Sequence, residues 1–171
     1  HTLGVVPDSR GLYTRLTARE NIAYYGELHG MAKSTIRERI GELIKTLDMD
    51  DFIDRRTEGF SQGQRVKVAI ARAMVHQPQT VLMDEPSNGL DVMSTRALRE
   101  YISSLKNAGD SVVLSTHIMQ EVAALCDRIV IIAKGRVAAD GTADQLMQRA
   151  GKDSLVDAFV QLIGSDEGLL A

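Results

Sequence analysis

The segment at residues 80–91, TVLMDEPSNGLD, constrains the fold of this chain more than any other. Its short apolar run at 81–83 ends in two adjacent carboxylates, Asp84 and Glu85. A short apolar run bounded by turn residues is typical of a buried parallel strand. The simplest interpretation is a core strand that ends in an acidic loop. Open α/β sheets, however, bind ligands at the carboxyl ends of their strands. The two carboxylates are therefore candidate ligand-binding groups.

The composition argues against several classes of protein. The chain has 171 residues, 44% of them hydrophobic, which is enough for a sizeable core. Its net charge of −3 and its aromatic content of 4%, with no Trp, argue against a nucleic-acid-binding surface. The one cysteine, Cys126, excludes an internal disulfide framework and is predicted to be a buried small hydrophobe. No stretch approaches the ~18 apolar residues that span a bilayer.

The pattern of elements changes at residue 80. Before it, residues 3–6 predict a strand, and Thr17 with Glu20 predicts a capping box at a helix start. Further helices are expected at 36–47 and about 60–76. After it, strands are predicted at 81–83, 111–115, 128–133 and 136–139, helices at about 94–107, 119–126, 142–150 and 153–163, and a frayed end at 164–171. This alternation predicts an α/β fold, a parallel sheet with helices on its faces, into which the helical block at about 11–76 is inserted.

Four further features align with the acidic strand end. The segment at 61–65, SQGQR, begins a predicted helix and combines a serine hydroxyl, a glycine and free amides, which suit an anion site or an ordinary N-cap. His117 follows the strand at 111–115 and is expected at the same sheet edge as the carboxylates, unless it is only a satisfied histidine. Asp91 suits turn chemistry, and Asp8 lies in the loop after the first strand.

Taken together, these segments resemble the ATP-binding subunit of ABC transporters. FSQGQ is similar to the signature motif of that family, VLMDE to its Walker B strand, SNGLD to its D-loop and STH to its switch histidine. The resemblance covers nearly the whole chain. GLYTRLTARENIAYYGELHG and SLVDAFVQLIG resemble a narrower branch, the ABC-2-type exporters, which includes sodium-extrusion and drug- or polysaccharide-export ATPases.

The resemblance implies a P-loop NTPase (RecA-like) fold, an α/β parallel-sheet core with an inserted α-helical signature subdomain. Residues 1–10 would then hold the end of a core strand and a Q-loop-like region, and residues 11–76 the helical subdomain with the signature motif. Residues 77–141 would form the RecA-like core, and residues 142–171 the carboxyl-terminal helices.

The resemblance also implies ATP and Mg²⁺ as cofactors and assigns roles to residues. Asp84 would orient Mg²⁺, and Glu85 would act as the general base or polarise the attacking water. His117 would bridge the γ-phosphate and that water. The signature residues would cap the γ-phosphate of a nucleotide held by another protomer: Ser61, Gln62, Gly63 and Gln64. Asp91 would lie across the dimer interface.

The sequence departs from the family pattern at three points. Asp8 stands where the family usually has Gln, and it is a candidate Mg²⁺ ligand. Gln62 stands where the signature usually has Gly. The phosphate-binding loop G-x-x-x-x-G-K-[ST] does not occur in the 171 residues. We therefore expect an amino-terminally truncated domain that binds ATP weakly or not at all, with exposed sheet surfaces that make it self-associate.

The predicted function is ATP binding and hydrolysis that energise an ABC-type membrane exporter. The expected partners are a membrane-spanning permease subunit, contacted mainly by residues 11–30, and a second nucleotide-binding subunit in a head-to-tail dimer, with no nucleic acid. The expected location is the cytoplasmic face of a prokaryotic cell membrane. Two alternatives remain: a soluble, non-transport ABC protein, and a non-catalytic binding or regulatory remnant. The sequence does not indicate the cargo.

Overall fold

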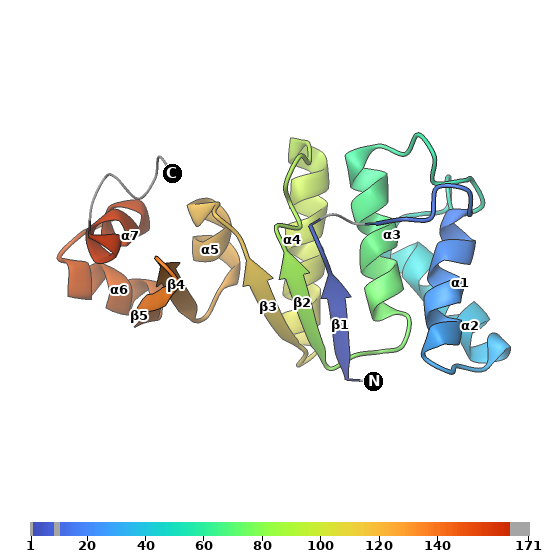
Figure 1. Ribbon diagram of the computed structural model, residues 1–171, viewed down its shortest axis with the longest axis horizontal. Coiled ribbons are helices and arrows are strands. Elements are labelled where there is room, and N and C mark those ends of the chain that lie inside the picture. Colours follow the sequence, from blue (N-terminus) through green and yellow to red (C-terminus); the bar gives the residue numbers. More distant parts are fainter. Residues whose placement is uncertain (1, 9–10, 165–171) are drawn as a thin grey trace. The chain divides into compact units, whose positions relative to one another are not determined.

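The computed structural model describes residues 2–8 and 11–164 and has an α/β fold (Figure 1). Its contacts divide the chain into two compact units, residues 1–115 and 116–171, which are described separately. The predicted fraying at 165–171 lies outside the described residues, and Gly164 ends the last helix with a φ of 85°. The predicted domain boundaries at 10, 76 and 141 stay predictions.

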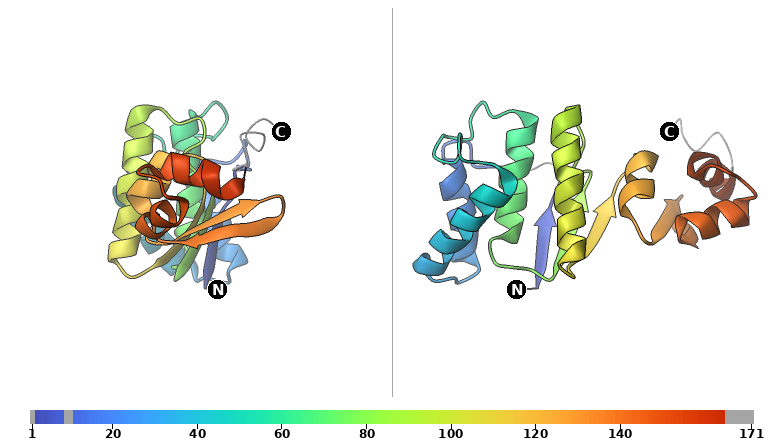
Figure 2. Two further views of the ribbon diagram at one scale, coloured as in Figure 1. Left: turned by 90° about the vertical axis from the view of Figure 1, so that its left-hand side faces the viewer. Right: turned by 180° about the vertical axis from the view of Figure 1, so that it is seen from behind.

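The first unit is built on a parallel sheet. Its three strands are β1 (Leu3–Val6), β2 (Thr80–Asp84) and β3 (Ser111–Ser115), and they lie in the order β1-β2-β3. Both pairings are parallel, which confirms the sheet expected from the sequence. Two helices, α3 (Gln62–Met74) and α4 (Val92–Asn107), cover one face of it. They lie in front of the strands when the molecule is seen from behind (Figure 2).

The covered face is closely packed. Val6, Val81 and Met83 point into it and are at most 1% exposed. Gly4 brings β1 against the end of α3, because a Cβ atom built on Gly4 would lie only 2.6 Å from the carbonyl oxygen of Ala73. Any side chain larger than hydrogen at this position would therefore push β1 away from α3.

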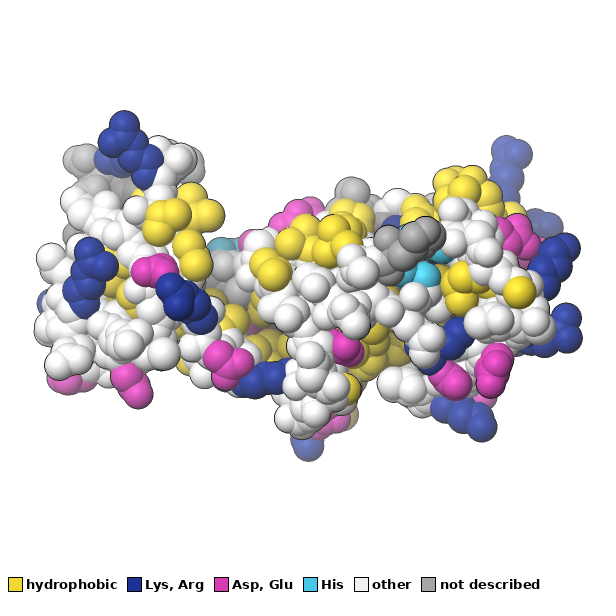
Figure 3. Space-filling view, turned by 90° about the horizontal axis from the view of Figure 1, so that it is seen from below, with side chains coloured by type: hydrophobic (Ala, Val, Ile, Leu, Met, Phe, Trp, Pro, Cys, Tyr) yellow, Lys and Arg dark blue, Asp and Glu magenta, His cyan; other side chains and the backbone are white. Residues whose placement is uncertain are grey.

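The opposite face of the sheet remains largely open. Val5, Leu82 and Val113 are register partners on this face and are 44%, 40% and 52% exposed, respectively. Figure 3 shows hydrophobic side chains at the surface in the region of these strands. Among the described helices of the first unit, none covers this face. In the first unit, α3 and α4 thus cover one face of the sheet, although parallel sheets are usually covered on both.

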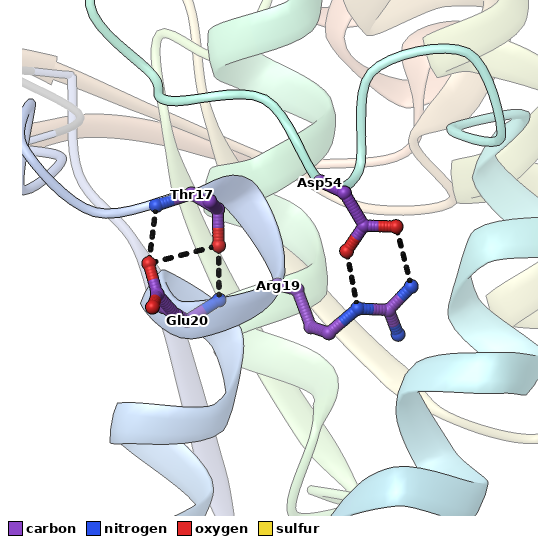
Figure 4. Close-up of polar contacts among 4 residues, drawn as sticks. All are labelled: Thr17, Arg19, Glu20 and Asp54. Carbon is purple, nitrogen blue, oxygen red and sulfur yellow. Dashed lines mark hydrogen bonds and ion pairs between the residues drawn. The ribbon is translucent and has the colours of Figure 1, made fainter.

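The remaining helices of the first unit form a pair that packs on α3. They are α1 (Ala18–Leu28) and α2 (Lys33–Leu47). The predicted capping box at the start of α1 is present, because Glu20 N donates to Thr17 Oγ1 and Thr17 N donates to the Glu20 carboxylate (Figure 4). The carboxylate also accepts from Thr17 Oγ1 at 3.0 Å, and the bonds from Thr17 N and Thr17 Oγ1 hold the pKa of Glu20 below its usual value. Arg19 forms a two-bond ion pair with Asp54, at 2.6 and 3.1 Å (Figure 4).

The chain enters and leaves the α1–α2 pair at one place. Ala18 N donates to Arg55 O at 3.1 Å, and Thr57 N donates to Leu16 O at 3.0 Å. Thr17 and Arg56 also form an isolated antiparallel bridge. Backbone hydrogen bonds therefore close the base of the pair.

A buried amide fixes the loop that precedes α1. Asn21 is fully buried, and its Oδ1 accepts a hydrogen bond from Tyr13 N at 2.9 Å. Its Nδ2 donates to the carbonyl oxygens of Tyr13 and Thr17, at 3.1 and 2.9 Å. Thr57, also buried, donates from Oγ1 to Tyr13 O at 3.0 Å. The side chain of Asn21 thus replaces backbone hydrogen bonds that the loop does not make itself.

The second unit combines a β-hairpin with three helices. Helix α5 (Met119–Leu125) precedes the antiparallel strands β4 (Ile129–Ala133) and β5 (Arg136–Gly141). The hairpin turns at Lys134 and Gly135, both with positive φ, as expected for a tight two-residue turn. Helices α6 (Ala143–Ala150) and α7 (Leu155–Ile163) follow. The core of this unit consists of Val122, Ile129, Ile131, Ala139 and Leu146.

One expectation is modified by this part of the structure. Cys126 is only half-buried at the border of the apolar cluster, rather than fully buried. In the part of the chain that the structure describes, no helix is long and apolar enough to cross a membrane.

A histidine pair lies where α1 and α3 approach β1. The rings of His29 and His76 are stacked, with centroids 3.7 Å apart and planes 10° apart. His76 Nε2 lies 3.1 Å from Leu3 O, and it must carry the proton because a carbonyl only accepts. Its Nδ1 is buried with no hydrogen-bond partner among the described residues. Burial lowers the pKa of His76 below 6.5, and the neighbouring His29 lowers it further.

We expect acid to destabilise the first unit through His76. The folded-state pKa of His76 is depressed, so below about pH 6.5 the unfolded chain binds the proton more readily and stability falls as the pH decreases. Chemical unfolding at pH 7.5 and 5.5, for the parent chain and for His76→Gln, measures this effect. The variant can still donate to Leu3 O but does not titrate, so its stability should change less between the two pH values. Equal changes in both proteins would contradict the prediction.

Candidate functional site

The two predicted carboxylates lie at the carboxyl end of β2, where one residue of β3 contacts both. Asp84 is the last residue of β2, is exposed, and accepts a hydrogen bond from Ser115 Oγ. Ser115 is its register partner at the end of β3. Glu85 is half-buried, and its backbone N donates to Ser115 O at 3.0 Å. Ser115 therefore holds the side chain of Asp84 and the backbone of Glu85.

Glu85 adopts an unusual backbone conformation. Its φ is 44°, in the left-handed region that residues other than glycine rarely occupy. Asn88 N donates to Glu85 O at 3.1 Å, so the residue is tied on both sides. Left-handed non-glycine residues cost about 1 kcal/mol or more and persist where surrounding bonds enforce them, often at functional sites. This conformation agrees with a functional role for Glu85.

The predicted interface residue Asp91 caps α4. Its carboxylate accepts from Ser94 N at 2.9 Å and from Ser94 Oγ at 2.8 Å. These two bonds hold the pKa of Asp91 below its usual value, and the bond from Ser94 N has the larger effect. Helix α4 begins at Val92, two residues earlier than predicted, because this cap stabilises its first turn. The simpler interpretation of Asp91, local turn chemistry, is thus present in the structure. Its place at a dimer interface stays a prediction.

The predicted signature residues form the start of α3. Ser61 Oγ accepts from Gln64 N at 3.2 Å, and Gln64 Oε1 accepts from Ser61 N at 3.1 Å, which makes a complete capping box. An ordinary N-cap therefore exists here. Ser61 and Gln62 are exposed at this helix start, where the partial positive charge favours an anion. The local geometry is compatible with both interpretations.

The signature residues lie against the first turn of α4 and the turn that precedes it. A Cβ atom built on Gly63 would lie 2.6 Å from Ser94 Oγ. A Cβ atom built on Gly89, whose φ is 71°, would lie 3.7 Å from the side-chain nitrogen of Gln62. The structure therefore brings together the predicted signature motif and the predicted D-loop, which are separate in the sequence.

Asp8 and His117 lie in the segments that follow β1 and β3, respectively. Asp8 is exposed, two residues beyond the end of β1. His117 belongs to the second unit, where it is exposed just before α5. The neighbouring Thr116 accepts from Ile118 N at 3.1 Å and donates to the buried carboxylate of Glu121 at 3.3 Å. The shared sheet edge of His117 and the carboxylates stays a prediction.

The site offers few metal-binding groups of its own. Among residues 2–8 and 11–164, no three His, Cys, Asp or Glu side chains are gathered in a way that could hold a metal ion. Mg²⁺ is usually bound through one or two carboxylates together with substrate phosphates and waters. The exposed carboxylate of Asp84, at a strand end, fits that kind of site.

Three residues that sequence reasoning missed support the predicted ones. Ser115 contacts Asp84 and Glu85, Ser94 contacts Asp91, and Glu121 holds the segment next to His117. The contact of Ser115 had no signal in the sequence, because it depends on the register of β2 and β3, which a single sequence does not fix. Ser94 and Glu121 are ordinary helix residues in the sequence.

Comparisons with known proteins show the family of this chain. The sequence profile of the family described as ABC transporter matches residues 1–88. The ABC transporter ATP-binding protein NatA of Bacillus subtilis is 44% identical over 88% of this chain and 61% of its own length. The linearmycin resistance ATP-binding protein LnrL of the same organism is 33% identical over 98% of this chain and 53% of its own length.

A solved structure shows the same fold. It is described as the structure of an ATP-binding subunit of an ABC transporter, with a TM-score of 0.83 and 30% identity, and the match covers 94% of this chain and 68% of that one. The fold is thus that of an α/β nucleotide-binding domain of the P-loop NTPase class. The chain belongs to the ATP-binding proteins of ABC transporters. It spans between about half and three fifths of the length of these two curated relatives.

Proposed function

We propose that this chain supplies the hydrolytic and signature residues of an ATP-binding subunit that energises an ABC-type exporter. The observation that carries the proposal is the pair Asp84 and Glu85 at the carboxyl end of a parallel strand, held by Ser115. Open α/β sheets bind ligands at this edge. The names of relatives, which include a linearmycin resistance protein and Nod factor export proteins, support export as the direction.

Each site residue has a defined task in this proposal. ATP supplies the phosphoryl group, and Mg²⁺ neutralises charge on its oxygens. Asp84 would hold Mg²⁺, with Asp8 as a second candidate ligand. Glu85 would accept a proton from the attacking water or orient it, and His117 would bind the water and the γ-phosphate. The start of α3, with Ser61, Gln62, Gly63 and Gln64, would bind the γ-phosphate held by a second subunit.

The partners follow from the same proposal. The second nucleotide-binding subunit would pair head to tail, with Asp91 in the interface. The permease would contact the helical pair, where a hollow between α1 and α2 has an apolar floor of Ala23, Ile36 and Ile40. Charged side chains surround this floor: Arg19, Glu27, Lys33 and Arg37. Such a hollow suits an amphipathic segment. The complex would lie at the cytoplasmic face of the cell membrane.

ATP binding and hydrolysis test the proposal. For the 171-residue chain alone we expect no turnover of Mg-ATP, because the G-x-x-x-x-G-K-[ST] loop that cradles the phosphates does not occur in it. A chimera with the preceding part of NatA ahead of this chain should hydrolyse ATP. In the chimera, Glu85→Gln should reduce the rate by about 100-fold or more, since a positioned general base contributes that much.

The exposed Glu38 of α2 provides a matched control for the chimera, because Glu38→Gln makes the same chemical change far from the motifs in the sequence. It should leave the rate unchanged. A chimera that binds ATP without hydrolysing it would favour a non-catalytic module, and turnover that is insensitive to Glu85→Gln would contradict the role of Glu85. Turnover by the chain alone, abolished by Glu85→Gln, would mean that a phosphate-binding segment exists within these residues.

We also expect the isolated chain to self-associate. The apolar row of Val5, Leu82 and Val113 lies on an open sheet face, and such patches tend to pair with another surface. Sedimentation velocity over a range of concentrations should show a concentration-dependent oligomer. Leu82→Lys, on the open face, should weaken it. A monomer of the parent chain at high concentration would contradict this prediction.

A further inference from the structure

Two segments that carry predicted site residues meet in the first unit. We define the signature turn as residues 61–64 and the D-loop turn as residues 87–91. We propose that Ser94 is a positioning residue that joins these turns into one unit, by filling the space beside Gly63 while it binds Asp91. The contacts of Ser94 support the joining of the two turns. The relevance of this joining to ATP hydrolysis rests on the proposed function.

The first contact explains why residue 63 is a glycine. Inside a helix, alanine is normally more favourable than glycine. At Gly63, however, a Cβ atom would lie 2.6 Å from Ser94 Oγ and 3.4 Å from Ser94 Cβ, closer than the hydroxyl allows. Gly41 of α2 also lies in a helix with ordinary φ. Its surroundings are open, because a Cβ atom built on it would meet nothing within 4 Å. The glycine of the signature turn is therefore required by packing within this chain.

The second contact fixes the hydroxyl that fills this space. Ser94 Oγ donates to Asp91 Oδ2 at 2.8 Å, and Ser94 N donates to Asp91 Oδ1 at 2.9 Å. If the hydroxyl rotated away from Gly63, it would lose its bond to the carboxylate. The depressed pKa of Asp91, which these bonds cause, shows that they favour the charged carboxylate. The hydroxyl is thus held between the two turns.

A third contact joins the same two turns at another point. Gly89 of the D-loop turn lies against the side chain of Gln62, with 3.7 Å between its built Cβ atom and the Gln62 nitrogen. Gln62 stands where the family usually has glycine. The D-loop turn is also tied to Glu85, because Asn88 N donates to Glu85 O at 3.1 Å. A shift of the signature turn would thus be transmitted through Ser94 to the segment that begins at the proposed catalytic carboxylate.

A double-mutant cycle tests the steric contact. In the parent chain, Gly63→Ala should lower the thermal unfolding midpoint by about 5 °C, because overpacking of this kind costs a few degrees in a unit of this size. In the Ser94→Ala background, the same change should have no effect or raise the midpoint, because the clash with the hydroxyl is gone. As the matched control, Gly41→Ala should raise the midpoint equally in both backgrounds.

Backbone NMR tests the transmission between the turns. Asp91→Asn removes the charge that binds Ser94, and it should shift the amide signals of Gly63 and Gln64 in the parent chain. In the Ser94→Ala background these shifts should be lost, whereas Ser94→Thr, which keeps a hydroxyl, should retain them.

Two results would overturn the proposal. One is that Gly63→Ala destabilises the chain equally with and without the Ser94 hydroxyl. The other is that the amides of the signature turn do not respond to Asp91→Asn. Neither measurement uses ATP, so a failure of the chimera to hydrolyse ATP would count against the proposed function and leave the role of Ser94 intact.

Discussion

Asn21→Asp is expected to lower the free energy of unfolding of the first unit by about 4 kcal/mol at neutral pH, the range found when a buried charge loses its compensation. The change is isosteric and keeps the acceptor that binds Tyr13 N. It replaces the donor that binds the carbonyl oxygens of Tyr13 and Thr17 with a carboxylate oxygen. A fully buried negative charge would then face two carbonyl oxygens.

The pH dependence of the stability of Asn21→Asp shows how much of the stability loss is due to the introduced charge. Burial and the neighbouring carbonyl groups would raise the pKa of the introduced aspartate, so it is protonated more readily in the folded state. The stability loss should therefore shrink as the pH falls, because the protonated acid can donate one hydrogen bond again. Urea unfolding followed by far-UV circular dichroism, at two pH values, measures both effects.

The exposed Asn107 at the end of α4 offers a matched control. Asn107→Asp introduces the same charge at the surface and should change the stability by about 0.5 kcal/mol or less. If Asn21→Asp cost no more than this control, the buried amide would not be what holds the loop before α1.

Gly4→Ala is expected to cost about 3 kcal/mol, at the upper end for overpacking. The added methyl would lie 2.6 Å from Ala73 O and 2.9 Å from Pro78 Cγ. The carbonyl belongs to the backbone of α3 and cannot rotate away as a side chain could. The strand must then move, and its pairing with β2, which runs from Leu3 to Val6, would be weakened.

The neighbouring residue provides the control for Gly4→Ala. Val5 points to the open face of the sheet and is 44% exposed, so Val5→Ala should cost much less than the change at Gly4. Both variants are compared by urea unfolding and by amide exchange of β2. A cost for Gly4→Ala no larger than that of Val5→Ala would show that β1 and α3 can separate without loss.

Much of this architecture could be predicted from the sequence because its signals are local. Strand β3 was predicted at its observed bounds, and the capping box of Thr17 and Glu20 was predicted at the start of α1. Each depends on residues that are neighbours in the chain. The position of Asp84 and Glu85 at a strand end was also local information, since the apolar run stops immediately before them.

The supporting contacts could not be predicted, because they depend on packing between distant segments. Ser94 is an unremarkable helix residue until α3 brings Gly63 beside it. The contact of Ser115 with Asp84 requires the register of two strands, which a single sequence does not fix. The open sheet face was likewise hidden, because Leu82 and Met83 are equally apolar in the sequence and only the fold distinguishes them as 40% exposed and fully buried, respectively.

The closed base of the α1–α2 pair has a consequence for engineering. Segments whose two ends lie side by side are the ones that insertion and exchange tolerate. Here Leu16 and Thr57 are joined by a backbone hydrogen bond, so another helical hairpin of different length could be grafted between them if it kept the buried amide of Asn21. The registers of β1, β2 and β3 would be unaffected. Such a graft would change the surface of the helical pair and leave the strands in place.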